Sequence, residues 1–137
     1  VGPARRMHDD RKSQSELIDE SIKYRAPDII VIDEILKDSM ETIFTVRQRN
    51  VQMIASAHGS LSDLVRIGHY NKLIGGITST IATGGKMKLE KTDKSCFEII
   101  IELLSPTSMR VYRNPDECIE RLLRGKAPIP DYSYVYR

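Results

Sequence analysis

Short aliphatic runs alternate with segments of helical periodicity along the first half of the chain. Residues 29–32 are four consecutive aliphatic residues, and residues 51–55 form a second apolar run. A β-branched run of this length favours a fully buried strand of a parallel sheet. Between the two runs, Asp38 and Glu41 begin a segment with apolar residues at helical spacing. A strand, a helix and a strand at this spacing predict a βαβ unit with parallel pairing and a right-handed crossover.

Helix signals stand on both sides of this unit. Ser13 and Glu16 form a capping box, which predicts a helix that ends by Pro27. After the second run, Ser60 or Ser62 is expected to begin a short helix. The first half of the chain is therefore expected to place helices around a buried parallel pair.

The pattern changes in the second half of the chain. Residues 77–82 predict a short strand, and a polar, lysine-rich segment follows them. Alternating apolar residues over 97–103 predict a longer strand, and turn-forming residues at 105–108 lead into another strand, which gives a β-hairpin. Asn114 is then expected to cap a helix that ends at Gly125.

Composition indicates an ordinary globular protein. Of 137 residues, 40% are hydrophobic and 29% are charged, which excludes wholesale disorder, and residues 1–125 are expected to form one domain with a loose tail at 126–137. The formal net charge of +2 is too mild to indicate nucleic-acid binding by itself. Cys96 and Cys118 fit no CxxC pattern and are expected to be reduced thiols of an intracellular protein. No segment approaches the length of a transmembrane helix.

Two acids follow the first aliphatic run. Charged groups are costly to bury, so Asp33 and Glu34 are expected where the strand emerges, at its carboxyl end. In nucleotide-binding α/β folds a Walker B motif lies at this place, with Asp33 holding magnesium and Glu34 activating the attacking water. Alternatively, the pair caps the next helix or solvates a turn. Ser56 and His58 follow the second run, where either could sense a γ-phosphate, although a lone histidine at a strand end is more often structural.

Basic residues supply candidates for phosphate contacts. Arg6 and Arg49, together with Ser56, are candidate nucleotide-binding residues, and an arginine finger for a neighbouring subunit could be any one of Arg5, Arg6, Arg47 and Arg49. The alternative for each arginine is a solvated surface. The segment GGK at 84–86 fails as a phosphate-binding loop, because Met87 replaces the Ser or Thr that should reach magnesium, so we interpret it as a turn.

Five segments, in this order, resemble the stage III sporulation protein AA-like P-loop ATPases, which are bacterial and plastid AAA-type proteins. The segments are RRM at 5–7, PDIIVIDEI at 27–35, AHG at 57–59, LIGGI at 73–77 and LLRG at 122–125. The resemblance implies the carboxyl-terminal half of a RecA-like core, an α/β fold with a parallel sheet flanked by helices and with a C-terminal β-hairpin and helix. It also implies ATP and Mg²⁺ as cofactors and a ring of identical subunits.

In that family the phosphate-binding strand, loop and helix precede the RRM segment, so the core is expected to be incomplete at its N-terminus. The predicted function is therefore that of the Walker B-containing part of an ATP hydrolase, with no activity expected for this polypeptide alone. The alternative is a non-catalytic module for assembly or binding. A nucleic-acid binder that uses the arginines is weaker, since aromatic residues are only 6%. The family occurs in bacteria and plastids, which implies the cytoplasm or the plastid stroma.

Overall fold

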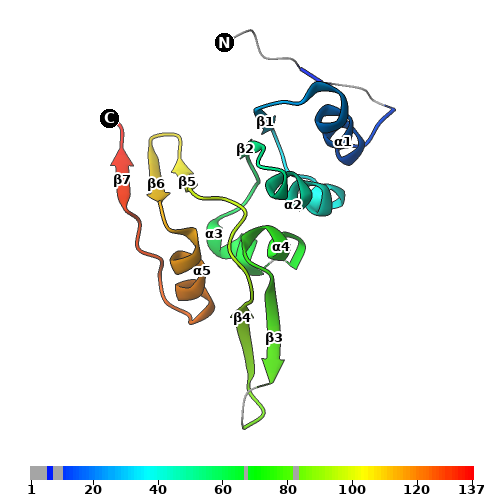
Figure 1. Cartoon of the computed structure of the whole chain (residues 1–137). Coiled ribbons are helices and arrows are strands. Elements are labelled where there is room, and N and C mark those ends of the chain that lie inside the picture. The colour runs from blue at the N-terminus through cyan, green and yellow to red at the C-terminus, as the bar shows by residue number, and fades with distance from the viewer. Residues whose placement is uncertain (1–5, 8–10, 67, 82–83) are drawn as a thin grey trace. The chain divides into compact units, whose positions relative to one another are not determined.

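The computed structural model describes residues 6–7, 11–66, 68–81 and 84–137. The chain divides into two compact units, Val1–Ala57 and His58–Arg137, whose elements are labelled in Figure 1. Each unit is described by itself below.

The first unit contains one parallel pair of strands and its helices. Its elements, in chain order, are α1 (Gln14–Arg25), β1 (Ile29–Ile32), the 3₁₀ turn η1 (Lys37–Ser39), α2 (Met40–Gln48) and β2 (Gln52–Ala55). Strands β1 and β2 pair in parallel, with Ile29 beside Gln52 and Ile32 beside Ala55. The predicted strand–helix–strand order and the parallel pairing are therefore present. The predicted cap is present too, because the Ser13 hydroxyl accepts the Glu16 N–H at 3.2 Å.

Only one face of this pair is buried. Ile30 and Ile32 alternate with residues that remain exposed, and Val31 keeps 72% of its surface accessible. The prediction of a fully buried strand was wrong because the described sheet has two strands, and one of its faces has no cover. The buried side belongs to a core that also includes Ile18, Ile35, Met40, Ile43 and Val46.

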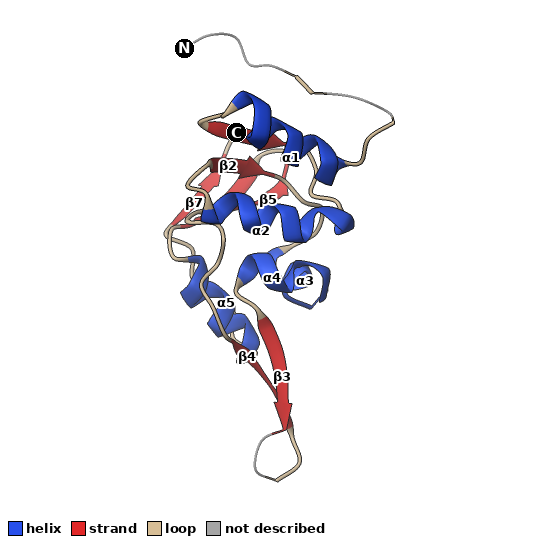
Figure 2. Cartoon of the chain, turned by 45° about the vertical axis from the view of Figure 1, so that its right-hand side comes forward, coloured by secondary structure: helices blue, strands red, loops and turns tan. Residues whose placement is uncertain are grey.

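The second unit is built from hairpins and short helices. Its elements are α3 (Leu61–Arg66), the 3₁₀ turn η2 (Gly68–Tyr70), α4 (Asn71–Ile74), β3 (Ile77–Ile81), β4 (Met87–Lys91), β5 (Ile100–Ser105), β6 (Ser108–Tyr112), α5 (Pro115–Leu123) and β7 (Tyr132–Val135). Strands β3 and β4 form an antiparallel ribbon, and β5, β6 and β7 form an antiparallel sheet in that order. Figure 2 shows helices and strands in a second view.

Several local predictions agree with this unit. The hairpin of β5 and β6 turns at Pro106 and Thr107, and the Asn114 side chain accepts the Glu117 N–H at the start of α5. The GGK segment is not part of a helix or strand, and Gly84 and Gly85 have positive φ angles of 101° and 78°. In contrast, the tail is not loose throughout, because β7 pairs with β6. The predicted boundary between residues 125 and 126 stays a prediction.

The predicted RecA-like core is wrong. The described strands form three small sheets, of which only β1–β2 is parallel, whereas a RecA-like core is one continuous parallel sheet. The physical reason lies in the connections. Parallel neighbours need a crossover of a dozen or more residues, and β1 and β2 have one. Short connections join β3 to β4 and β5 to β6, so these pairs are antiparallel hairpins, and β7 is antiparallel to β6 although the long segment 113–131 joins them.

Candidate interaction surface

The carboxyl ends of β1 and β2 meet as the sequence predicted. The Ser56 N–H donates to the Ile32 carbonyl at 3.2 Å, and the Ile35 N–H donates to the Ser56 carbonyl at 2.9 Å. The Ser56 hydroxyl donates to the main-chain carbonyl of Asp33. The side chains of Asp33 and Glu34 are both exposed. Ser56 therefore lies beside the acidic pair, but its hydroxyl proton serves the main chain and closes the end of the parallel pair.

Gln14 holds the segment that follows the acids. Its side-chain amide donates to the Glu34 carbonyl at 2.6 Å, and its side-chain oxygen accepts the Leu36 N–H at 3.0 Å. This double contact fixes the backbone that leaves β1 against the first turn of α1. Asp33 and Glu34 thus lie on a turn whose backbone is fixed by hydrogen bonds. Their exposed side chains agree with the alternative prediction that the acidic pair solvates a turn.

The donor set does not by itself fit a magnesium site. Within the residues that the structure describes, no group of three or more His, Cys, Asp or Glu side chains could hold a metal ion. Two exposed carboxylates from adjacent residues supply few of the six oxygens that Mg²⁺ requires. The roles of Asp33 as a metal ligand and Glu34 as a base, and ATP and Mg²⁺ as cofactors, stay predictions.

The other predicted site residues are spread over the chain. Arg49 follows α2 and precedes β2, so it lies at the amino end of the parallel pair, about 13 Å of strand away from the acids. Arg6 is exposed and lies outside the helices and strands. His58 is the first residue of the second unit, and its side chain is exposed. Arg5 lies outside the described residues. The topology thus places Arg49 apart from Asp33 and Glu34, and the role of His58 stays a prediction.

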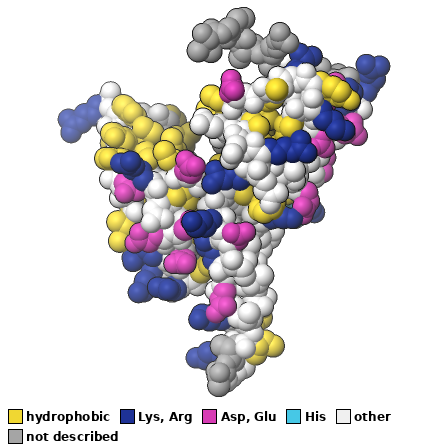
Figure 3. Space-filling model, in the orientation of Figure 1, with side chains coloured by type: hydrophobic (Ala, Val, Ile, Leu, Met, Phe, Trp, Pro, Cys, Tyr) yellow, Lys and Arg dark blue, Asp and Glu magenta, His cyan; other side chains and the backbone are white. Residues whose placement is uncertain are grey.

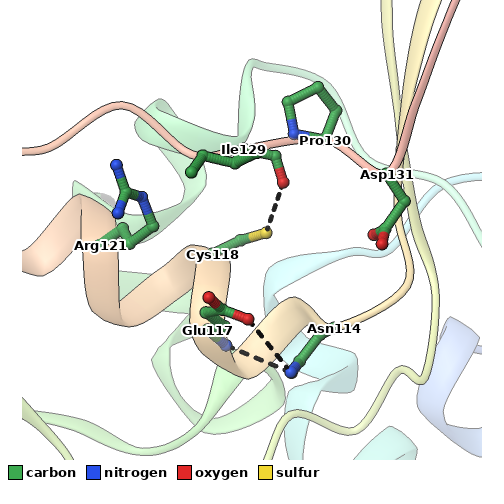
Figure 4. Close-up of a pocket in the computed structure, with 7 residues that line it drawn as sticks. All are labelled: Asn114, Glu117, Cys118, Arg121, Ile129, Pro130 and Asp131. Atoms are coloured by element: carbon green, nitrogen blue, oxygen red, sulfur yellow. Dashed lines mark hydrogen bonds between the residues drawn. The ribbon is translucent and has the colours of Figure 1, made fainter.

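A small cavity lies beside α5 (Figure 4). Its volume is ≈ 160 Å³, and it is lined by Asn114, Glu117, Cys118, Arg121, Ile129, Pro130 and Asp131. Burial raises the pKa of the Cys118 thiol, and the nearby carboxylates of Asp131 and Glu117 raise it further. The protonated thiol faces the Ile129 carbonyl at 4.0 Å. A neutral thiol is a poor nucleophile, and the cavity is smaller than a typical ligand site, so this place does not have the properties of an active site.

The most unusual surface of the second unit is one face of the β5–β6–β7 sheet. In the strand register, Ile101 lies beside Val111, which lies beside Tyr132, and Leu103, Met109 and Tyr134 form the next row. Directly paired residues share a face of a sheet. We call the face formed by Ile101, Leu103, Met109, Val111, Tyr132 and Tyr134 the open face. Figure 3 shows hydrophobic side chains gathered over these strands.

The opposite face of the same sheet is covered around Tyr112, whereas Arg110, Ser133 and Val135 on that face are exposed. Tyr112 is completely buried and packs with Leu61 and Cys118. Glu102 ties this side together, since one carboxylate oxygen accepts the Leu61 N–H at 2.8 Å and the other accepts the Tyr112 hydroxyl at 3.3 Å. Burial raises the pKa of Tyr112, and so does the negative charge of Glu102. The part of this face around Tyr112 is therefore a core with satisfied polar groups, whereas most side chains of the open face remain exposed.

The open face has no charged side chain at any of its six positions. Leu103 is 76% exposed, Ile101, Tyr132 and Tyr134 are also exposed, and the two tyrosine rings lie 6.2 Å apart. A contiguous apolar patch of this kind on a small unit marks an interaction surface. The sequence reasoning missed it, although the alternation of Tyr132 and Tyr134 in the tail could have indicated a half-exposed strand.

Comparison with known proteins finds plastid relatives. The chain is 34% identical to the uncharacterized protein ycf45 of Cyanidium caldarium, over 92% of this chain and 41% of that protein. It is 30% identical to the protein SEEDLING PLASTID DEVELOPMENT 1 of Arabidopsis thaliana and to ycf45 of Porphyra purpurea, over 93% of this chain and 20% and 25% of those proteins. The chain thus spans less than half of the length of these relatives. No family model and no solved structure matches the chain.

These comparisons correct the functional prediction. The similar proteins are plastid-encoded or plastid-related, and they belong to a different group from the stage III sporulation protein AA-like ATPases. Nothing in them indicates ATP binding or ATP hydrolysis, so the prediction of an ATPase fragment was wrong. In the described part of the chain, no helix is long and apolar enough to cross a membrane.

Proposed function

We propose that this chain is an assembly module that associates with a second copy of itself through the open face, and that it works in a plastid. The open face is the observation that carries the proposal. Two such faces packed together would form a two-layered sandwich with the sheets about 10 Å apart. The sheet would then be covered by the second copy on its open face and by the core around Tyr112 on the other.

The chemistry of the open face suits a symmetric dimer. In a twofold interface the same patch of both copies meets itself, so a patch of one charge would meet its own sign. Here all six positions are uncharged, and each copy presents the same two rows of three side chains to the other. The tyrosine hydroxyls at the rim can remain in contact with water.

The size of the open face predicts a weak dimer. With aromatic side chains that contribute about 150–250 Å² each when fully buried, the half-exposed residues offer on the order of 500 Å² per copy. Two copies would bury roughly 1,000 Å², which is the lower limit for a specific interface. We therefore expect a dissociation constant in the micromolar range, so that assembly responds to concentration.

The plastid location is supported by the relatives and agrees with the cysteines. SEEDLING PLASTID DEVELOPMENT 1 is named for plastid development, and the match covers 93% of this chain and 20% of that protein. Cys96 and Cys118 are buried, and neither is part of a disulfide. A fluorescent fusion of the complete gene product should coincide with plastid autofluorescence in its source cell, and a cytosolic signal would refute the location.

Sedimentation velocity tests the assembly. The wild-type chain should sediment faster as its concentration rises through the micromolar range, whereas Leu103→Lys should remain a monomer because an ammonium on the packed face would lose its water. Val135→Lys is the matched control, since Val135 is also 76% exposed but pairs with Ser108, on the other face of the sheet. Circular dichroism confirms that each variant is folded. A wild-type monomer at every concentration, or an unaltered Leu103→Lys dimer, would refute the proposal.

A further inference from the structure

The β3–β4 ribbon is fixed firmly at its base. Ile77, the first residue of β3, is buried in the core of the second unit together with Val65 and Ile119. Opposite it, the Lys91 ammonium forms an ion pair with Asp116 at 2.8 Å. The carbonyl of Gly75 accepts hydrogen bonds from two successive N–H groups just beyond β4, at 3.0 and 2.9 Å. The base of the ribbon is therefore part of the packed unit.

Within the described residues of the second unit, nothing covers the apolar side chains at the outer end of the ribbon. Figures 1 and 2 both show β3 and β4 extending away from α4 and α5. Ile81 is 80% exposed and Met87 is 74% exposed, and the two residues are direct partners across the ribbon. A two-stranded ribbon in water is only marginally stable, so its exposed apolar end needs an explanation.

The two faces of the ribbon differ in chemistry. Ile81, Met87 and Leu89 lie on one face, in line with the buried Ile77. The other face carries threonines and the exposed ion pair of Lys88 with Glu90, 3.3 Å apart. The ribbon is thus amphipathic along its length, with its apolar side chains on one face.

We propose that the β3–β4 ribbon binds the surface of an anionic lipid bilayer with its apolar face. Ile81, Met87 and Leu89 enter the boundary between headgroups and acyl chains, as the apolar face of an interfacial element does. Lys86, next to the start of β4, and Lys88, on the polar face, have flexible stems that let their ammonium groups reach lipid phosphates at the margin of the contact. The exposed ion pair to Glu90 is too weak to hold Lys88 back.

The arrangement favours a bilayer over a nucleic acid. A protein that binds a phosphate backbone places several cations on the face that touches it. On this ribbon the exposed side chains of the face proposed to make the contact are mostly apolar. The lysine on the same face, Lys91, forms an ion pair with Asp116 at the base of the ribbon. The described ribbon therefore offers an apolar face with lysines at its margin. These features are complementary to an anionic membrane surface, where anionic headgroups lie above apolar chains.

Vesicle sedimentation tests the proposal on the complete chain. The protein should pellet with vesicles that contain phosphatidylglycerol, and several-fold less with pure phosphatidylcholine. The variant Ile81→Ser/Met87→Ser should lower the partition coefficient at least tenfold. Val135→Ser, which removes an equally exposed apolar side chain outside the ribbon, should leave it unchanged. Lys86→Gln/Lys88→Gln should remove the preference for phosphatidylglycerol and its salt dependence.

Contrary results would overturn the proposal directly. Equal sedimentation of wild type and Ile81→Ser/Met87→Ser, or no sedimentation of the wild type with either vesicle, would refute a lipid contact. Salt-dependent retention of a short DNA duplex that the same double variant abolishes, without vesicle binding, would identify a nucleic-acid surface in its place. Because the ribbon is separate from the open face, Leu103→Lys should bind vesicles like the wild type, so the two proposals fail independently.

Discussion

Replacing Asp116 with asparagine should loosen the base of the β3–β4 ribbon. The Asp116 carboxylate receives the Lys91 ammonium at 2.8 Å and the Ser95 N–H at 2.8 Å, so it joins α5 to the end of β4. Asparagine keeps the shape and can still accept the Ser95 N–H. It removes the negative charge, and the ammonium of Lys91 then has no counter-ion in a nearly buried place.

The expected cost is about 2 kcal/mol. The Lys91 side chain is only 8% exposed, whereas the Asp116 side chain is 36% exposed. Removing one partner of a buried pair costs about 3–5 kcal/mol, and an exposed pair contributes at most about 1 kcal/mol. The half-exposed carboxylate places this pair between the two limits. For a unit of this size, such a loss lowers the melting temperature by roughly 10 °C.

The same contact fixes the sign of the pH dependence. Burial alone would raise the pKa of Asp116, but the Lys91 ammonium and the Ser95 N–H outweigh it and hold the pKa below the usual 3.8. At a pH between the two pKa values, Asp116 is therefore ionised in the folded state but protonated in the unfolded state. The stabilisation is complete above about pH 4 and disappears as the pH falls through the lower, folded-state pKa. Asp116→Asn should lack this part of the acid dependence.

Urea unfolding followed by circular dichroism measures both effects. Lys91→Met should lower the free energy of unfolding less than Asp116→Asn does. The Asp116 carboxylate that loses its ion pair can be hydrated by water, whereas the nearly buried Lys91 ammonium cannot. Glu120→Gln, at an exposed acid on the same helix, is the control. If Asp116→Asn changes the free energy of unfolding at pH 7 by no more than the roughly 0.5 kcal/mol of ordinary surface substitutions, the ion pair does not anchor the ribbon.

Two further results are expected from the same unit. Gly75→Ala should cost about 2–3 kcal/mol in urea unfolding, because Gly75 has a φ of +127° and an added Cβ would lie 2.7 Å from the Asp93 carbonyl oxygen, whereas Gly125→Ala, at an open position with a φ of +74°, should cost about 1 kcal/mol. Equal costs at the two glycines would contradict this account of the turn. The Cys118 thiol, with its raised pKa and its burial, should react with a disulfide reagent only as fast as the unit opens, and immediate reaction in the folded protein would contradict its burial.

Local sequence signals predicted the elements that depend on local chemistry. The Ser13 cap, the Asn114 cap with its proline, and the turn at Pro106 all follow from short-range hydrogen bonds and backbone preferences. Strand β4 escaped prediction because Met87–Lys91 is exposed on most positions, and an exposed ribbon leaves no pattern of burial in its sequence. Strand β7 escaped because its pairing with β6 is nonlocal.

The number of strands in a sheet could not be predicted from local sequence signals either. Residues 29–32 have the composition of a central strand, yet within the described chain β1 has β2 as its single partner. The proximity of Ser56 to Asp33 could be predicted, since it follows from parallel pairing alone. The open face could not, because it depends on the register of three strands, one of which lies in the tail.

Chemical crosslinking between two copies tests the central claim most directly. In a face-to-face sandwich, Leu103→Cys faces the second sheet across about 10 Å, so a flexible bismaleimide long enough to span the open face should join two copies at this position. Val135→Cys, on the other face of the sheet, should give little dimer under the same conditions. We expect a large fraction of crosslinked dimer for Leu103→Cys, and this fraction should disappear when the protein is diluted below the micromolar range. Equal crosslinking at both positions, or none at position 103, would contradict the claim.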